Sequence, residues 1–186
     1  MRVYNYKYTK TWFMHSDLRY HLVNFLDKSN VNNILEIGCY EGLTSVFFAD
    51  NFIDNQNSSL TCVDPFLHID NNDHRLLLQN GEELNFDYNI SNCKNTDRIV
   101  IHKITSDKFF ENNNRSYNFI YIDGCREPDF IQRDMENSFK FLEKNSMMLM
   151  YDYDGEIKEV ADNFIEKYNG RCKVIDKGYQ IAIRKW

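Results

Sequence analysis

The sequence lacks three features that would each point to a particular class of protein: paired cysteines, a basic tract and a long apolar run. Its five cysteines are odd in number, scattered and without C-x-x-C spacing, so we interpret them as reduced thiols of an intracellular protein with no zinc site. The net charge of −6, with no concentrated stretch of Lys or Arg, argues against nucleic acid or an anionic membrane as a partner.

No segment is apolar enough for a transmembrane span, and residues 1–30 contain no signal-peptide stretch. We therefore expect a cytoplasmic protein. Abundant Asn, Lys, Ile, Tyr and Phe suggest an AT-rich genome, such as that of a large DNA virus or a protist, and for a virus the location would be the host cytoplasm.

The 186 residues, of which 42% are hydrophobic, suit one domain with a sizeable core, and we find no internal repeat or linker. Apolar positions between Thr11 and Lys28 predict an amphipathic helix. We therefore divide the chain into an N-terminal helical segment, 1–30, and the domain proper, 31–186.

Strand and helix patterns alternate five times along the chain, which ends in a hairpin. Strands are expected over 33–38, 59–64, 98–104, 117–124 and 146–152, with the hairpin over 172–176 and 179–184. Helices are expected over 43–53, 74–89, 106–110, 128–144 and 156–168, with Ser106 as the N-cap of the third. This alternation predicts an α/β fold, a parallel sheet with helices on both faces and one antiparallel strand from the hairpin.

The most informative stretch is 34–42, which reads as a buried strand, a glycine turn and the start of a helix. Gly38 and Gly42 have no Cβ, so backbone N–H groups there can closely approach a ligand. Asp64 ends the next strand, where an acidic side chain can hydrogen-bond ribose hydroxyls. Together these features indicate a nucleoside-containing cofactor, although a tight turn without a ligand is the alternative. The turn lacks the middle glycine of G-x-G-x-x-G, which argues against NAD or FAD.

These motifs, in this order, resemble class I S-adenosylmethionine-dependent methyltransferases, and in particular small O-methyltransferases of the catechol and sugar types. Glu36 to Gly42 is similar to their motif E-h-G-x-[YF]-x-G, Thr105 to Asp107 to their adenine-contacting segment, and Tyr121 to Gly124 to h-I-D-G. The resemblance implies a Rossmann-like, seven-stranded, mostly parallel sheet with an antiparallel last strand, and an N-terminal helix over the site. It implies that S-adenosylmethionine is bound by Glu36, Gly38, Cys39, Tyr40, Gly42, Asp64, Thr105, Ser106 and Asp123.

Two aspartates follow neighbouring strands, Asp123 after 117–122 and Asp152 after 146–151. Ligands of such sheets bind outside the carboxyl ends of the strands, so we expect both carboxylates to face the cofactor crevice. The resemblance to metal-dependent members implies that they ligate Mg²⁺ or Ca²⁺. The third ligand position holds Tyr153, a poor ligand for a hard cation, and Asp154 is the residue that could substitute for it.

Arg126 stands where the catechol-type enzymes have a lysine base. Arginine stays protonated, so we expect it to orient the substrate or to stabilise a developing alkoxide. The predicted catalytic residues are therefore Asp123, Arg126 and Asp152. The structural alternatives are that Asp123 stabilises a turn and that Asp154 caps the following helix.

The resulting expectation is an enzyme that methylates a hydroxyl of a small molecule, with a sugar or nucleotide-sugar as the first candidate, possible help from a divalent metal, and no nucleic-acid or membrane partner. A homodimer could complete the acceptor pocket. The alternatives are a cofactor-binding module without catalysis, an RNA methyltransferase and, last, an NAD-dependent enzyme.

Overall fold

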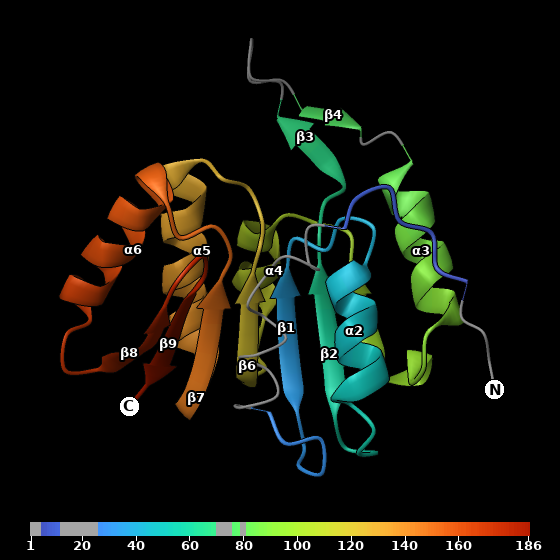
Figure 1. Ribbon diagram of the computed structural model, residues 1–186, viewed down its shortest axis with the longest axis horizontal. Helices are drawn as coiled ribbons and strands as arrows, with labels where there is room; N and C mark the ends of the chain where they lie inside the picture. Colours follow the sequence, from blue (N-terminus) through green and yellow to red (C-terminus); the bar gives the residue numbers. More distant parts are fainter. Residues whose placement is uncertain (1–4, 12–25, 70–75, 79–80) are drawn as a thin grey trace.

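The computed structural model describes residues 5–11, 26–69, 76–78 and 81–186. Its main sheet has seven strands in the order β5-β2-β1-β6-β7-β9-β8 (Figure 1). Five neighbouring strands are parallel, and β9 runs antiparallel between β7 and β8. The strands are β1 Asn33–Ile37, β2 Ser59–Val63, β5 Ile99–His102, β6 Tyr117–Ile122, β7 Leu142–Met150, β8 Cys172–Lys177 and β9 Ile181–Lys185. This confirms the predicted fold class, including the antiparallel last strand.

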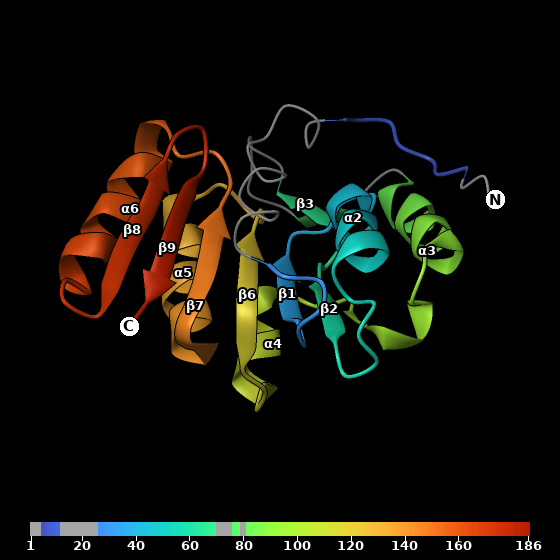
Figure 2. The same cartoon turned by 60° about the horizontal axis from the view of Figure 1, so that its bottom comes forward.

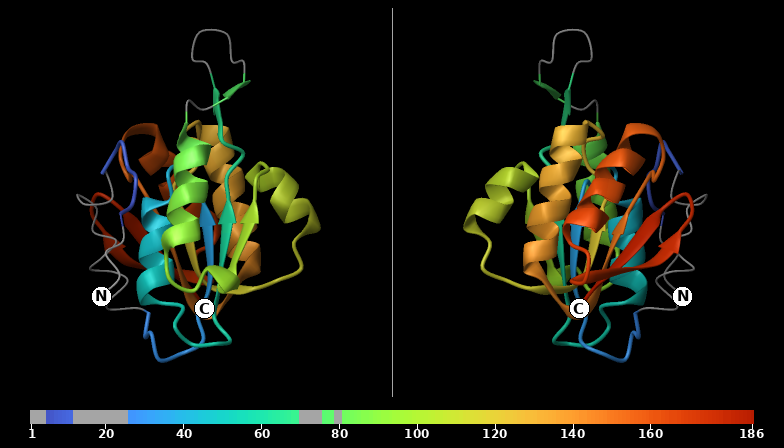
Figure 3. Two further views of the ribbon diagram at one scale, coloured as in Figure 1. Left: turned by 90° about the vertical axis from the view of Figure 1, so that its right-hand side faces the viewer. Right: turned by 90° about the vertical axis from the view of Figure 1, so that its left-hand side faces the viewer.

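Helices cover both faces of the sheet, because successive strand residues point to opposite sides and both sides are apolar. One core contains Ile34, Leu60 and Phe119 with residues of α2 (Leu43–Asn51) and α3 (Glu82–Asn92). The other contains Leu35 and Ile120 with residues of α4 (Ser106–Asn112), α5 (Pro128–Phe141) and α6 (Gly155–Lys167). Figures 2 and 3 show the strands side by side, with α2 and α4 on opposite faces. No helix in the described ranges is long and apolar enough to cross a membrane.

The region between β2 and β5 differs from the expectation. The helix predicted over 74–89 begins only at Glu82, after Gly81 with φ 95°, and ends at Asn92. Before it, β3 (Leu67–Ile69) and β4 (Leu76–Leu78) pair antiparallel as a separate hairpin, and a short 3₁₀ helix, Thr96–Arg98, precedes β5. The hairpin projects beyond the carboxyl edge of the main sheet (Figures 1 and 3).

Two further expectations concern helix starts and the N-terminal segment. The N-cap of α4 is Thr105 and not Ser106, because the Thr105 hydroxyl accepts the Lys108 backbone N–H at 3.4 Å. The helix predicted over 11–28 lies mostly outside the described residues, and the described residues 26–28 are not helical. The strand predicted over 146–152 begins earlier, at Leu142, directly after α5.

Candidate active site

The last residues of three adjacent strands are in register, which brings three loops together at the carboxyl edge of the sheet. Ile37 of β1 pairs with Ile122 of β6, and Ile122 pairs with Met150 of β7. Gly38 and Asp123, which follow the first two, therefore emerge next to each other, and the Asp123 backbone N–H donates to the Ile37 carbonyl at 2.8 Å.

Gly38 is required by this close approach. Its φ is 82°, and a Cβ at this position would overlap the Asp123 carbonyl oxygen and lie 2.5 Å from the Asp123 carbonyl carbon. Gly42 also has a left-handed φ of 78°, and its Cβ would lie 3.0 Å from the Phe86 ring. The turn between β1 and α2 is thus packed on both sides through its two glycines.

Asp64 holds the shape of this turn. Its Oδ2 accepts the backbone N–H groups of Cys39 at 2.7 Å and Tyr40 at 2.9 Å, and its Oδ1 accepts that of Phe66 at 2.7 Å. The residue is 8% exposed. The predicted ribose-binding carboxylate therefore lies beside the predicted cofactor turn, which it organises through the backbone.

Glu36 is fully buried in the core next to the turn, at the position paired with Cys62 of β2. The Ser45 hydroxyl donates to its Oε2 at 2.5 Å, while Oε1 has no hydrogen-bond partner among the described residues. Burial raises the pKa of the Glu36 carboxyl well above its usual range. Glu36 therefore joins the end of β1 to the first turns of α2 from inside the core.

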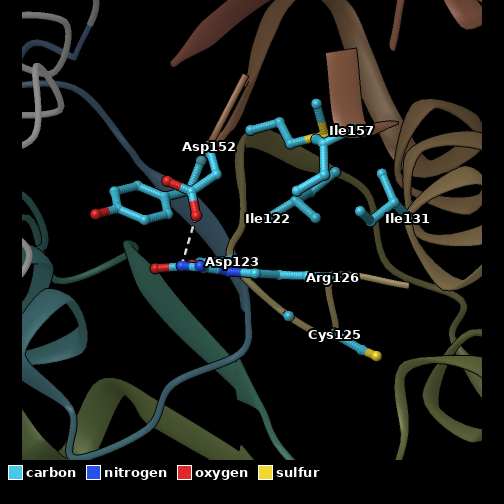
Figure 4. A pocket seen from close by; sticks show the side chains of 10 residues that line it. Ile122, Asp123, Cys125, Arg126, Ile131, Asp152 and Ile157 are labelled. Atoms are coloured by element: carbon cyan, nitrogen blue, oxygen red, sulfur yellow. Dashed lines mark ion pairs between the residues drawn. The ribbon is translucent and has the colours of Figure 1, made fainter. Parts of the chain in front are cut away.

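The three predicted catalytic residues share one small pocket, which Asp123, Arg126, Tyr151 and Asp152 help to line. Arg126 Nη2 lies 2.5 Å from Asp152 Oδ2, and Figure 4 shows Arg126 reaching the Asp152 carboxylate with Asp123 alongside. The Asp152 side chain is only 9% exposed, whereas that of Arg126 is 62% exposed. Asp152 also has a left-handed φ of 55°, which turns the chain sharply after β7.

Asp123 has an altered acidity. Burial raises its pKa to about 7, and the neighbouring Asp152 carboxylate acts in the same direction, whereas the Arg126 guanidinium and the Tyr121 hydroxyl lower it. The Tyr121 hydroxyl donates to Asp123 Oδ2 at 3.3 Å. A carboxyl group of this kind can both accept and release a proton near neutral pH.

The third acidic residue does not join the other two. Asp154 is exposed at the N-cap position of α6 and makes no side-chain capping bond. Tyr153 points to α6, where its hydroxyl donates to Asp162 at 2.6 Å. Among the described residues, the group of three metal-ligating side chains with ligand atoms within 4.8 Å of one another is the buried set Glu36, Cys39 and Cys62.

The sequence reasoning missed the tyrosines and the glutamine around the aspartates. Tyr179 donates to the Tyr151 hydroxyl at 3.3 Å, and a hydrogen bond to Asp152 raises the Tyr179 pKa. Gln180 is fully buried and donates to Tyr121 at 3.4 Å. The predicted strand order could have indicated them. An antiparallel last strand begins at the edge of the sheet where its parallel neighbour ends, so Tyr179 and Gln180, just before β9, lie beside the end of β7.

The predicted adenine segment lies after β5 at the same edge of the sheet. Thr105 caps α4, and the hydroxyl of Ser106 interacts with the buried carboxylate of Asp134 on α5. Burial raises the pKa of Asp134 to about 6, and its contact with Ser106 opposes that shift. Thr105 and Ser106 thus lie after β5, at the same carboxyl edge of the sheet as the cofactor turn and the two aspartates.

Residues 5–11 run along α3 and reach the cofactor turn (Figure 1). Lys7 and Asn89 exchange two hydrogen bonds of 2.7 Å, and the Thr9 backbone N–H donates to Glu41 Oε2 at 2.6 Å. Glu41 Oε1 accepts from Asn85 of α3 at 2.7 Å, and Glu41 is 1% exposed. The N-terminal segment, α3 and the turn are therefore joined through one buried carboxylate.

The family model described as methyltransferase domain matches residues 35–153, which include the turn, both aspartates and Arg126. A comparison with curated proteins gave no match.

Many solved structures have similar folds, including the following three. A Clostridium thermocellum protein described as an rRNA methylase superposes with a TM-score of 0.69 at 13% identity, over 96% of this chain and 98% of that one. A Streptococcus mutans protein, described as a methyltransferase in complex with S-adenosylhomocysteine, superposes with a TM-score of 0.66 at 11% identity. The match covers 97% of this chain and 100% of that one. The O-methyltransferase TomG from Streptomyces achromogenes, in complex with S-adenosylmethionine, superposes with a TM-score of 0.60 at 13% identity. The match covers 83% of this chain and 74% of that one.

Proposed function

The chain belongs to the methyltransferase domain family, as a class I S-adenosylmethionine-dependent methyltransferase, and we propose that it methylates a hydroxyl group of a small molecule. A sugar or a nucleotide-sugar is the first candidate acceptor. The observation that carries this proposal is the position of Asp123, which contacts the cofactor turn through its backbone and faces Arg126 and Asp152 through its side chain.

The residues present fit the cofactor. Gly38 and Gly42 let the turn pack closely against Asp123 and Phe86, and Asp64 accepts the Cys39 and Tyr40 backbone N–H groups and so fixes the shape of the turn. When bound, S-adenosylmethionine would supply a methyl group activated by its sulfonium, whose sulfur would leave as a thioether when the acceptor oxygen attacks the methyl carbon in line. The task of this chain is to hold the acceptor at near-contact distance and to remove its proton.

We assign the proton transfer to Asp123. With a pKa of about 7, a fraction of this carboxylate is ionised at neutral pH and can take the proton of the acceptor hydroxyl. Arg126 lines the same pocket, where its positive charge can stabilise negative charge developing on that oxygen, and Asp152 holds Arg126 in position.

RNA methylation is the alternative, since two structural neighbours, from Clostridium thermocellum and Streptococcus thermophilus, are described as rRNA methylases. The net charge of −6 and the absence of a basic tract in the sequence weigh against it. A cofactor-binding module without catalysis is the other alternative, and it predicts cofactor binding with no transfer to any acceptor.

The first experiment is a calorimetric titration with S-adenosylhomocysteine, followed by methyl-transfer assays against nucleotide-sugars, simple sugars and rRNA. We expect micromolar binding and transfer to a hydroxyl of a sugar compound. Asp123→Asn should abolish transfer while keeping cofactor binding, whereas Asp97→Asn, an exposed aspartate before β5, should change neither. Transfer to rRNA alone, or transfer that survives in Asp123→Asn, would contradict the proposal.

A further inference from the structure

The Asp123–Asp152 pocket already contains a positive charge. Arg126 Nη2 forms a 2.5 Å ion pair with Asp152 Oδ2, and the Asp152 side chain is almost buried. The Arg126 guanidinium also lies 5.9 Å from the centre of the Tyr151 ring, which favours a cation above its face. This ion pair joins the loop after β6 to the turn after β7, and both of its residues line the pocket.

The oxygen ligands that a hard divalent cation needs are incomplete in this pocket. Such cations take six or more oxygen ligands in proteins or in protein and water together. Of the three candidate carboxylates, Asp154 is exposed at the start of α6, and Asp152 is engaged by Arg126. The tyrosine at the third ligand position, Tyr153, bonds Asp162 instead. The donor set present therefore does not fit Mg²⁺ or Ca²⁺.

We propose that the guanidinium of Arg126 occupies, on Asp152, the place that a divalent cation would take, so that this enzyme works with a built-in cation and without a metal. The inference rests on the proposed function, because it assigns the charge that would face the acceptor oxygen. It also explains why an arginine, a residue that stays protonated, stands three residues after Asp123.

The geometry gives Arg126 two tasks. Arginine carries five N–H donors in a planar fork, and the ion pair with Asp152 uses one end of that fork. The other end can donate to the acceptor oxygen while Asp123 takes its proton.

The test is whether removing the guanidinium opens a metal site. Mn²⁺ binding to the whole chain is measured by the loss of its free electron paramagnetic resonance signal in wild type, Arg126→Met and Arg126→Lys. We expect weak binding in wild type, about tenfold or more tighter binding in Arg126→Met because a repelling charge is gone, and no gain in Arg126→Lys, which keeps the charge.

The matched control is Arg171→Met, an exposed arginine at the opposite, amino edge of the sheet, which should bind Mn²⁺ like wild type. The double variant Arg126→Met with Asp152→Asn should lose the gain, which would locate the new site on Asp152. Equal Mn²⁺ affinity in wild type and Arg126→Met would overturn the proposal, as would tight binding in wild type that Asp152→Asn removes.

The same proteins are titrated with S-adenosylhomocysteine, and their thermal midpoints are recorded to show that each is folded. No cofactor binding in wild type would remove the proposed function, whereas the Mn²⁺ comparison would still report whether Arg126 blocks the site. The titration with S-adenosylhomocysteine and the Mn²⁺ comparison therefore test the proposed function and the role of Arg126 separately.

Discussion

Replacing Gly38 with alanine tests the close approach of the cofactor turn to the end of β6. Two costs apply at this position. A φ of 82° is left-handed, which costs an alanine roughly 1–2 kcal/mol. The new Cβ would also overlap the Asp123 carbonyl, and pushing a packed neighbour aside typically costs about 1–3 kcal/mol more.

Gly170→Ala is the control that carries only the cost of the left-handed backbone, without the steric overlap. Gly170 has a nearly identical φ of 79°, and a Cβ there would meet nothing within 4 Å. We therefore expect Gly38→Ala to be less stable than Gly170→Ala by about 1–3 kcal/mol in urea unfolding, and its thermal midpoint to be lower by roughly 2–4 °C for each kcal/mol.

The two variants should differ in function as well. Because Asp123 and Gly124 must move to admit the Cβ, we expect Gly38→Ala to lose affinity for S-adenosylhomocysteine, whereas Gly170→Ala should bind it like wild type. If the two variants lose the same stability, within about 0.5 kcal/mol, the contact between Gly38 and Asp123 is not a rigid one and the reasoning fails.

Three other changes test the site. Asp64→Ala leaves the backbone N–H groups of the turn without their acceptor, so we expect a loss of about tenfold or more in S-adenosylhomocysteine affinity by calorimetry, and unchanged affinity would contradict its assignment. The Asp123 pKa of about 7 lies above its unfolded value near 3.8, so this group's contribution to stability should be lost as pH rises from about 4 to about 7. In thermal melts over this pH range, the midpoint of Asp123→Asn should lack this part of the decrease with pH. Glu41→Ala removes the acceptor of the Thr9 N–H and should cost about 1–3 kcal/mol in urea unfolding with faster proteolysis near the N-terminus, whereas Glu111→Ala, which breaks an exposed pair, should stay within about 1 kcal/mol.

The central strands could be predicted because each is a short apolar run that ends at a glycine or an aspartate. Ile34 to Ile37 and Leu60 to Val63 are almost completely buried, as expected for parallel strands covered on both faces. The hairpin of β3 and β4 could not be predicted in the same way. Three leucines near a helix-like pattern do not distinguish a strand from a helix, and what separates them here is the left-handed Gly81.

The convergence of Asp123 and Asp152 could also be predicted, since the carboxyl ends of parallel strands meet at one edge. The pairing of Arg126 with Asp152 could not, because it depends on the left-handed backbone of Asp152, which a sequence does not reveal for a residue other than glycine. The departure of Tyr153 toward α6 follows from its hydrogen bond to Asp162, nine residues further along on that helix. Local patterns therefore located the site, and long-range contacts determined its charge.

The hydrogen bonds from Cys39 and Tyr40 to Asp64 fix the shape of the turn through contacts within the protein. The cofactor would therefore meet a binding surface that is already in its final shape, and association would not require the turn to fold around it. We expect the observed rate of S-adenosylhomocysteine binding to rise linearly with ligand concentration, with no slow second phase in stopped-flow traces. The heat-capacity change of binding should likewise reflect the surface that the ligand itself buries, with no added contribution from ordering of the chain.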